Sequence, residues 1–494
     1  MTAGGGAGYC IAMMDIRPIA YVVGRILIVF AIMMLVPAVV DHRAGLKNGL
    51  DFLQCAILTG GTGVILSLAT RNSLGRTLDT RQAYVLTAAI WGVVPFFGAL
   101  PFYLGAPELA LTDAYFEAVS GITTTGASVI SGLDDLPDGM NLWRAMLNWL
   151  GGLGIAIIAM IFLPVLRVGG MQYFRTEGFD TFGKALPRAA DIAGQLLVIY
   201  LALTVLCIAT YSALGMTTFA AVTNGASTIS TGGFSPKMAS FSIYSGALEY
   251  AGAVFMILGS LPYVRYVQLV NGQAGPMWRD RQVRAYLRWI AYAVGSVTLW
   301  RLLTSDMRFE PAFREALFNL VSIMSSTGFG SGSFASWGGY ALVVAYVIGV
   351  IGACSGSSAA GLSVFRVQIA GAALLAQIRQ IATPNRIVAV KYDGRNVDVD
   401  VLDSLILFLV GYILMLGVLT LAMTMLGVDA ESAVWGVWAT LGNIGYGFGP
   451  MIAATGTFVD YPDAAKWIMT LAMLMGRLGL MAILVLTLPR FWRP

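Results

Sequence analysis

Four short runs, each containing a glycine, recur along this chain at intervals of about a hundred residues. Each run joins small or hydroxyl side chains to a glycine and is embedded in very apolar sequence. The runs are residues 120–129, 227–234, 323–330 and 441–447, and the glycines that close them are Gly126, Gly232, Gly328 and Gly445. A repeat of this length predicts four similar units whose loops meet on one axis.

The composition places these units in a membrane. Of the 494 residues, 57% are hydrophobic and only 11% are charged, whereas soluble chains average about 25% charged residues. So few charges cannot cover a surface that faces water, so we expect a polytopic membrane protein. The net charge of +4 is too small to indicate a nucleic-acid partner.

The apolar segments predict how each unit is built, because a spanning helix needs about 20 apolar residues. Residues 19–40 and 50–70 form a hairpin of two spans without a loop of this kind. After it, the order of span, half-helix, loop and span occurs four times. The paired spans are 83–105 with 142–166, 193–214 with 246–270, 289–304 with 339–372, and 401–426 with 464–488. The half-helices are 112–122, 219–227, 312–322 and 430–440.

The predicted fold is therefore all-α, with ten spans and four half-helices arranged in pseudo-symmetric repeats around a central pore. We divide the chain at the polar segments. The divisions are a flexible tail at 1–16, the hairpin at 17–81, and pore repeats at 82–190, 191–285, 286–400 and 401–494.

The basic residues predict the orientation. They cluster in segments 71–81, 167–188, 279–288 and 379–395, whereas the opposite loops are acidic. By the positive-inside rule the basic segments and both termini are cytoplasmic, and the four glycine loops open outward. Asp113 and Glu117 lie on the first half-helix, so we expect them, among the acidic residues, to attract cations to an outer mouth.

The half-helices predict what the loops do. A helix that enters from outside and stops midway places its C-terminus, which carries about −0.5 of an elementary charge, near the bilayer centre. An irregular loop exists at that depth only where it lines water or protein. Glycine permits backbone angles that turn carbonyl groups inward. Four such loops together favour a path for a desolvated cation.

Several of these segments resemble the TrkH/KtrB family of potassium-uptake proteins. They are residues 112–127 (TDAYFEAVSGITTTGA), 144–155 (RAMLNWLGGLGI), 230–235 (STGGFS) and 443–447 (NIGYG). The resemblance runs from about residue 17 to the end of the chain, and the extra N-terminal hairpin favours the TrkH type. It implies the potassium-translocating subunit of a Trk-type uptake system, which is a gated, channel-like pore and not an enzyme.

The resemblance also implies a selectivity filter of four loops that binds potassium, the substrate and the only metal expected. A serine replaces the first filter glycine in sodium-selective plant relatives, so Gly126 favours potassium. The implied filter residues are Thr124, Thr125, Gly126, Ser230, Thr231, Gly232, Ser326, Thr327, Gly328, Asn443, Ile444 and Gly445.

A second region lies inside the predicted span 339–372, which is interrupted by small and polar residues at 351–361. Such residues let a helix unwind, although they also permit close helix packing. The resemblance favours an intramembrane gating loop in which alanines at 353, 359 and 360 replace some of the family's glycines. The implied gate residues are Gly352, Cys354, Ser355, Gly356, Ser357, Ser358, Gly361 and Arg477.

Arg477 is predicted to lie within the last span, where an arginine marks a functional site by default. The alternative is that it extends to an interface, but about ten apolar residues follow it. The family usually has a glutamate where this chain has Gly479. We therefore expect Arg477 to face the pore and to bond to carbonyls or hydroxyls of the gating loop.

The resemblance implies partners as well. Such proteins are homodimers in the bacterial inner membrane and work with a cytosolic, TrkA-like regulatory subunit. We expect no covalently bound cofactor, and a nucleotide (NAD or ATP/ADP) only on that partner. The basic segments 167–188 and 379–395 are too short to fold as a nucleotide-binding domain, so we expect them to dock the partner.

Other functions remain open from the residues alone. The first alternative is a cation/proton or cation/sodium symporter, but proton relays use intramembrane carboxylates or histidines, and the spans have few. An intramembrane enzyme needs converging catalytic groups, whereas His42 is the only histidine and no carboxylate pair falls within a span. A non-conducting scaffold leaves the four loops unexplained.

Overall fold

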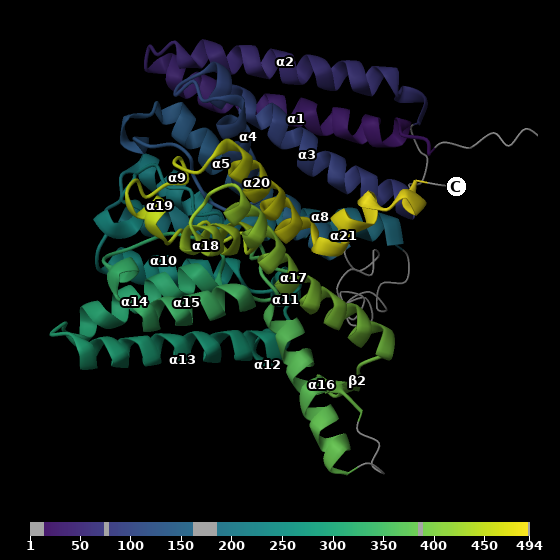
Figure 1. Cartoon of the computed structure of the whole chain (residues 1–494). Coiled ribbons are helices and arrows are strands. Elements are labelled where there is room, and N and C mark those ends of the chain that lie inside the picture. The colour runs from purple at the N-terminus through teal and green to yellow at the C-terminus, as the bar shows by residue number, and fades with distance from the viewer. Residues whose placement is uncertain (1–13, 74–78, 162–184, 384–388, 493–494) are drawn as a thin grey trace, which may run out of the picture.

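The computed structural model describes residues 14–73, 79–161, 185–383 and 389–492. This part of the chain is almost entirely helical, as the composition predicts (Figure 1). Within it, the one departure from an all-α fold is an antiparallel hairpin of β1 (Lys391–Tyr392) and β2 (Arg395–Asn396). Residues 162–184, which include most of the predicted basic segment 167–188, lie outside the described residues.

The N-terminal hairpin forms one edge of the molecule. Helices α1 (Arg17–Arg43) and α2 (Asn48–Ala69) pack along each other, and α13 (Arg281–Thr304) lies along the opposite edge (Figure 1). Large apolar side chains such as Ile57 and Ile65 point outward from α2 and are more than 60% exposed. A continuous apolar exterior of this kind is expected where lipid covers the protein.

Four helices of intermediate length lie at the centre of the fold, and each follows a longer helix against which it packs. The pairs are α3 (Thr80–Leu104) with α4 (Leu111–Ile122), α8 (Ala185–Ala213) with α9 (Thr218–Ile229), α13 with α14 (Phe309–Met324), and α17 (Val399–Met425) with α18 (Ala430–Leu441). The last turns of the four central helices are buried.

The helix after each central helix packs against the next central helix in sequence. Thus α5 (Asp138–Ile161) contacts α9, α10 (Ala247–Gly259) contacts α14, and α15 (Gly339–Ile351) contacts α18. The fourth, α20 (Asp463–Leu478), contacts α4. The order therefore closes on itself and surrounds a central axis with the four central helices.

Three of the predicted spans are broken in the structure, and the sequence indicates only the break within 339–372. The predicted span 246–270 becomes α10 and α11 (Tyr263–Val270), which meet at an angle of 89°. The predicted span 339–372 becomes α15 and α16 (Val364–Ala382), separated by an irregular loop. The predicted span 464–488 becomes α20 and α21 (Leu480–Thr487), separated by Gly479 at φ 82°.

These interruptions affect how many spans can be counted. Among the described residues, five helices are long and apolar enough to cross a membrane, and α10 with α11 makes a sixth if the bend joins halves of one span. The count of ten spans and the repeat boundaries stay predictions. The remaining short helices are α12 (Gly275–Arg279), α19 (Pro450–Ala453), and 3₁₀ turns at Arg71–Ser73, Leu133–Asp135, Ser240–Ile243, Phe334–Ser336 and Pro489–Phe491.

Candidate functional site: a ring of four loops above an intramembrane loop

All four central helices end in the same backbone motif. A non-glycine residue adopts a left-handed conformation just past each helix end, namely Thr124 (φ 52°), Thr231 (52°), Ser326 (58°) and Asn443 (48°). The amide of the following residue then donates to a carbonyl five residues earlier, at 2.8 Å in every case. This is the Schellman arrangement, which normally uses glycine. A left-handed non-glycine costs roughly 1–2 kcal/mol, so the surrounding packing must hold these four residues.

The residues after these motifs form a closed ring. A Cβ atom added to Gly126 would overlap the carbonyl oxygen of Gly232, and one added to Gly233 would overlap that of Thr327. In the same way, a Cβ atom on Gly328 would overlap the carbonyl oxygen of Ile444, and one on Gly445 would overlap that of Thr125 in the first loop. Each loop therefore packs its glycine against a carbonyl of the next loop, and the fourth loop closes on the first.

This ring corrects the register that we expected for the second loop. There, the left-handed glycine that matches Gly126 is Gly233 (φ 77°), not Gly232. Gly232 instead occupies the position of Thr125, and Ser230 is the helix cap, which lies outside the ring positions. Two consecutive glycines left this register open in the sequence, because either can adopt the required φ angle.

The other three loops keep the expected register, and side chains behind the ring support them. The hydroxyl groups of Thr123 and Thr125 are 2.7 Å apart, as are those of Ser325 and Thr327. Asn443 donates from Nδ2 to Thr125 Oγ1 at 2.8 Å and to the carbonyl of Met473. Hydroxyl groups thus bond to one another behind the loops, while the loop backbone forms the ring.

A cavity of about 660 Å³ lies on one side of the ring, and we call it the vestibule. Its walls include the four ring glycines Gly126, Gly233, Gly328 and Gly445. The charged residues among its walls are Arg144, Lys237 and Glu431. Asp113 and Glu117 do not line it.

The expected role of Asp113 and Glu117 at the mouth is therefore wrong, because both are held in ion pairs. Glu117 is fully buried, and its Oε1 lies 2.8 Å from Nε of Arg144. Asp113 lies 2.6 Å from Nζ of Lys466 on α20. The first central helix is packed between other helices along its length, so its carboxylates face those helices instead of water.

Arg144 joins the first central helix to the exits of the first two loops. Besides Glu117, it donates from Nη1 to the carbonyl of Ser235 at 2.9 Å and from Nη2 to Ser128 Oγ at 3.1 Å. Its guanidinium also lies 4.2 Å from the centre of the Phe234 ring. Ser128 follows the first loop and Ser235 the second, so this arginine ties the two loop exits together.

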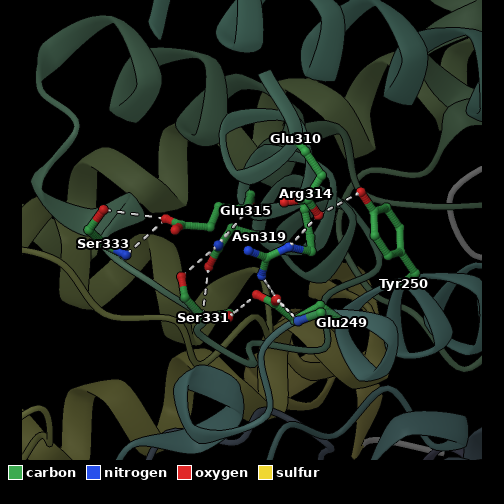
Figure 2. A network of polar contacts seen from close by, with 9 residues as sticks. Glu249, Tyr250, Glu310, Arg314, Glu315, Asn319, Ser331 and Ser333 are labelled. Atoms are coloured by element: carbon green, nitrogen blue, oxygen red, sulfur yellow. Dashed lines mark hydrogen bonds and ion pairs between the residues drawn. The ribbon is translucent and has the colours of Figure 1, made fainter. Parts of the chain in front are cut away.

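An equivalent cluster supports the third and fourth loops. Figure 2 shows Glu249 of α10 beside Arg314 of α14, with Ser331 donating its hydroxyl to the same carboxylate. Glu249 is only 1% exposed. Asn319 accepts from the Ser331 amide and from the Tyr446 hydroxyl, both at 3.1 Å. The cluster therefore connects the exits of loops three and four.

The second central helix, α9, has no side chain that accepts a hydrogen bond from its own loop exit among the described residues, and the sequence explains why. Asn224 stands where Glu117 and Asn319 stand in their helices, and both polar atoms of its side chain are buried without a partner among the described residues. Glu117 and Asn319 each accept a backbone N–H from the residue twelve positions later. At that position the second unit has Pro236, which has no N–H.

Two carboxylates close to residues of the vestibule wall, Asp134 and Asp429, have lowered pKa values. The hydrogen bond from Lys237, 3.0 Å away, lowers the pKa of Asp134 below its ordinary value. The backbone amide of Ser432 lowers the pKa of Asp429, which caps α18. Both groups therefore stay ionised at neutral pH.

On the other side of the ring, α15 gives way to an irregular loop over residues 352–363. Its ends are joined, since the amides of Leu362 and Ser363 donate to the carbonyls of Val350 and Ile351 at 3.1 and 2.8 Å. Gly352 packs against Gly361 at this closure. The segment thus leaves the helix and returns to nearly the same place, which fits the interruption seen in the sequence. We call it the intramembrane loop.

Contacts from several helices hold the intramembrane loop below the ring. Ser326 Oγ accepts from the amide of Ala360 at 3.3 Å, which links the loop directly to a ring motif. Tyr263 bonds to Ser358 through its hydroxyl at 2.7 Å and donates its amide to Gly356 at 2.9 Å. Within the loop, Ser357 donates to the carbonyl of Cys354, which is buried.

Arg477 connects the loop to the first ring motif. Its Nη2 donates both to the carbonyl of Ser358 and to Oγ1 of Thr124. The Ser358 carbonyl is a partner of the kind that we expected in the absence of a glutamate at position 479, whereas the hydroxyl of Thr124 belongs to the first ring motif and not to this loop. The guanidinium lies at the end of α20, just before the break at Gly479.

The alanines in this loop do not occupy the strained positions. Positive φ angles occur at Gly352, Gly356, Gly361 and Ser363, whereas none occurs at 353, 359 or 360. Three of these four positions are glycines, and the fourth is Ser363, the residue just before α16.

Sequence reasoning missed the buried ion pairs. Glu249 and Lys466 both lie in the first turn of the helix that follows a loop, and their partners Arg314 and Asp113 lie on the next central helix. In the sequence, each pair is indicated only by one charged residue at the start of an apolar helix. The sequence does not identify the partner of that residue, because the partner lies in a different repeat unit.

Comparison with known proteins agrees with this geometry. The TrkH family, described as cation transport protein, matches residues 51–493. The Trk system potassium uptake protein TrkI of Halomonas elongata is 35% identical over 479 residues, covering 96% of this chain and 97% of TrkI. The TrkH protein of Escherichia coli K12 is 33% identical over 491 residues, covering 97% and 100%.

A solved structure is equally similar. The crystal structure of the potassium transporter TrkH from Vibrio parahaemolyticus superimposes with a TM-score of 0.90 at 32% identity, covering 97% of this chain and 100% of that one. Both the matched family and this structure are of transporters, not enzymes. The chain is a multi-pass membrane protein that belongs to the TrkH family of cation transport proteins.

Proposed function

We propose that this chain is the potassium-translocating subunit of a Trk-type uptake system and works as a gated, channel-like pore. The observation that carries the proposal is the closed ring, in which each of four loops packs a glycine against a carbonyl of the next. The relatives named as potassium uptake proteins support the choice of ion.

In this proposal the ring is a selectivity filter. A potassium ion leaves its water in the vestibule and is coordinated by loop carbonyls, including those of Thr125, Gly232, Thr327 and Ile444. The four central helices direct their C-terminal ends at the same place, and the partial negative charge there offsets the lost hydration. A glycine at each ring position lets the carbonyls of neighbouring loops come this close.

The intramembrane loop is the gate. It lies directly below the ring, and hydrogen bonds from Arg477 and to Ser326 hold it there. Its carbonyls and hydroxyls are bonded to side chains of other helices, so a modest rearrangement of those helices would move it. We assign its opening to a shift of α15 relative to α16.

A cation/proton symporter is not favoured. The buried carboxylates Glu117 and Glu249 are held in ion pairs with Arg144 and Arg314, so neither is an unpaired intramembrane carboxylate of the kind that proton relays use. These pairs support the loop exits and suit a fixed filter.

The proposal also includes the membrane, the orientation and the partners of the pore. We place the chain in a bacterial inner membrane as a homodimer, with both termini cytoplasmic and the vestibule outside. A cytosolic, TrkA-like subunit would bind the nucleotide, whether NAD or ATP/ADP, and control the gate. The cytoplasmic end of α16 and the β1–β2 hairpin, which carry Arg379 and Arg395, are the described part of the docking surface.

Growth of a potassium-uptake-deficient bacterium at low potassium tests the function. Expression of this chain with its regulatory subunit should restore growth, and an excess of sodium should not prevent it. Expression of the same chain with Gly126→Ser tests whether the ring is responsible. Absence of rescue by a wild-type chain that reaches the membrane contradicts the proposed function.

A further inference from the structure

A second cavity, of about 610 Å³, lies at the end of the molecule opposite the vestibule. Three arginines of α13, Arg281, Arg284 and Arg288, line it together with Leu287 and with Gln368 of α16. Arginines three and four residues apart lie on one face of a helix. Three positive charges therefore face one small volume.

Hydrogen bonds and an ion pair fix the elements that line this cavity. Gln368 donates from Nε2 to the carbonyl of Arg281 at 3.3 Å and accepts from the hydroxyl of Tyr392 at 3.0 Å. These bonds join the start of α13, α16 and the β hairpin. Asp280 caps α13 by accepting the amide of Gln282 at 2.7 Å, and it also pairs with Arg265 of α11 at 2.7 Å. The arginines thus project from a helix end that is fixed on several sides.

The positive charge of this cavity is only partly balanced. Arg281 lies 3.5 Å from Asp393, and both side chains are nearly half exposed. Arg284 and Arg288 instead donate to backbone carbonyls, those of Arg279 and Arg284. In the described part of the chain, neither is paired with a carboxylate. A guanidinium has five donors in a planar fork that matches phosphate oxygens, so most of these donors remain for an anion.

The position of the arginines along α13 indicates where such an anion would come from. Trp278, just before α13, is 71% exposed, and Tyr292, one turn after Arg288, is 68% exposed. Exposed tryptophan and tyrosine at a helix end mark the level of lipid headgroups. Further along the same helix, Leu299 is 59% exposed, as expected for a side chain in contact with lipid hydrocarbon. The arginines therefore lie at headgroup depth with an apolar surface beside them.

We propose that this cavity binds an anionic phospholipid. The phosphate would lie among Arg284, Arg288 and Arg281, and the acyl chains would follow the exposed face of α13 past Tyr292. Basic pockets between helices at the cytoplasmic side are known to suit anionic headgroups. The apolar path beside the arginines distinguishes a lipid from a soluble phosphate.

The test uses the full-length protein purified in a mild detergent and titrated with phosphatidylglycerol, with bound lipid counted by native mass spectrometry. The double variant Arg284→Gln/Arg288→Gln should bind phosphatidylglycerol about tenfold more weakly or worse. Arg25→Gln is the matched control, because Arg25 is an exposed arginine of α1 on the far edge of the molecule. It should bind as the wild type does.

Three further measurements keep the result interpretable. Phosphatidylcholine should bind weakly to all variants, and inorganic phosphate at millimolar concentration should not displace phosphatidylglycerol. Arg284→Lys/Arg288→Lys, which keeps the charge, should recover part of the affinity and shows whether the site still folds. Equal phosphatidylglycerol affinity in the Gln variant, equal binding of phosphatidylcholine, or displacement by phosphate would each overturn the lipid site.

Discussion

Two separate constraints exclude a side chain at Gly126. Its φ angle of 80° is one that other residues rarely adopt, and an added Cβ would overlap the carbonyl oxygen of Gly232 in the neighbouring loop. The second constraint matters more for function, because relieving the overlap must displace a ring carbonyl. The position of that carbonyl, in the proposed filter, decides which ion fits.

We therefore expect Gly126→Ser to lower the discrimination of potassium against sodium. Ion-competition flux on purified protein in liposomes measures the ratio. Gly132→Ser is a matched control, since Gly132 has φ 81° but no heavy atom within 4 Å of an added Cβ. The control should bear the same backbone strain and keep the wild-type ratio. An unchanged ratio in a folded, active Gly126→Ser protein would remove Gly126 from the filter.

Arg477 leads to a prediction about gating instead of selectivity, because it bonds to the intramembrane loop as well as to the ring. Hydrogen bonds to a charged group contribute about 1.5–3 kcal/mol, and every 1.4 kcal/mol is a factor of ten. Arg477→Ala should raise partner-free potassium flux roughly ten- to a hundredfold, with selectivity intact. Arg301→Ala, which removes an arginine stacked on Trp337 instead, serves as the control. Flux at the wild-type level in Arg477→Ala would make this arginine a packing residue.

Individual residues also show what the sequence could and could not predict. In loops one, three and four a single glycine follows the expected pair of residues, and that glycine is the one in the ring; that these loops bind potassium stays a prediction. Loop two was shifted by one residue, since Gly232 and Gly233 are equivalent in sequence and only the contact with Thr327 separates them. The burial of Asp113 depends on Lys466, more than 350 positions away, and no local pattern reveals such a contact.

At the scale of helices, two ion pairs join successive units, and the acid and the base exchange places between the two pairs. The acid lies on α10 and the base on α14 in one pair, whereas in the other the base lies on α20 and the acid on α4. We infer that this difference helps α20 to pack against α4 and close the ring correctly.

Breaking the closing pair should therefore destabilise the whole protein. Removing one partner of a buried pair costs about 3–5 kcal/mol, so Lys466→Asp should lower the unfolding temperature in detergent markedly. Adding Asp113→Lys in the same chain should recover part of the loss. Lys237→Asp is the control, because the pair with Asp134 is nearly half exposed and such pairs contribute about 0–1 kcal/mol. If the double variant is no more stable than Lys466→Asp, the pair does not act as a unit.

The intramembrane loop is the second element with a separable role. Deletion of two residues within 355–358 leaves the bonds at its base, from Leu362 and Ser363, in place. It removes the part that Arg477 and Tyr263 hold. We expect higher potassium flux without the partner and an unchanged ratio of potassium to sodium, measured in liposomes. A fall in selectivity would mean that the loop belongs to the filter.

At the scale of the whole molecule, the composition and the repeated order of segments predicted a helical membrane protein with four central half-helices. Hydropathy along the whole chain is enough to predict this class of fold, because a bilayer restricts a spanning chain to few structures. The breaks at Pro262 and Gly479 were not predicted. Apolar sequence continues on both sides of Gly479, whereas Pro262 is a residue that ends or kinks helices and was a signal left unused. Breaks of this kind depend on what the freed backbone groups can bond to in the folded protein.

The central claim is that the chain forms a passive, potassium-selective pore, and flux through the wild-type protein tests it most directly. Purified protein in liposomes should carry potassium down its gradient, with sodium a poor substitute and with no change in the signal of an enclosed pH dye. These results follow if loop carbonyls select the ion and the buried carboxylates stay paired. Potassium flux that requires a proton gradient, or sodium flux equal to that of potassium, would contradict the account.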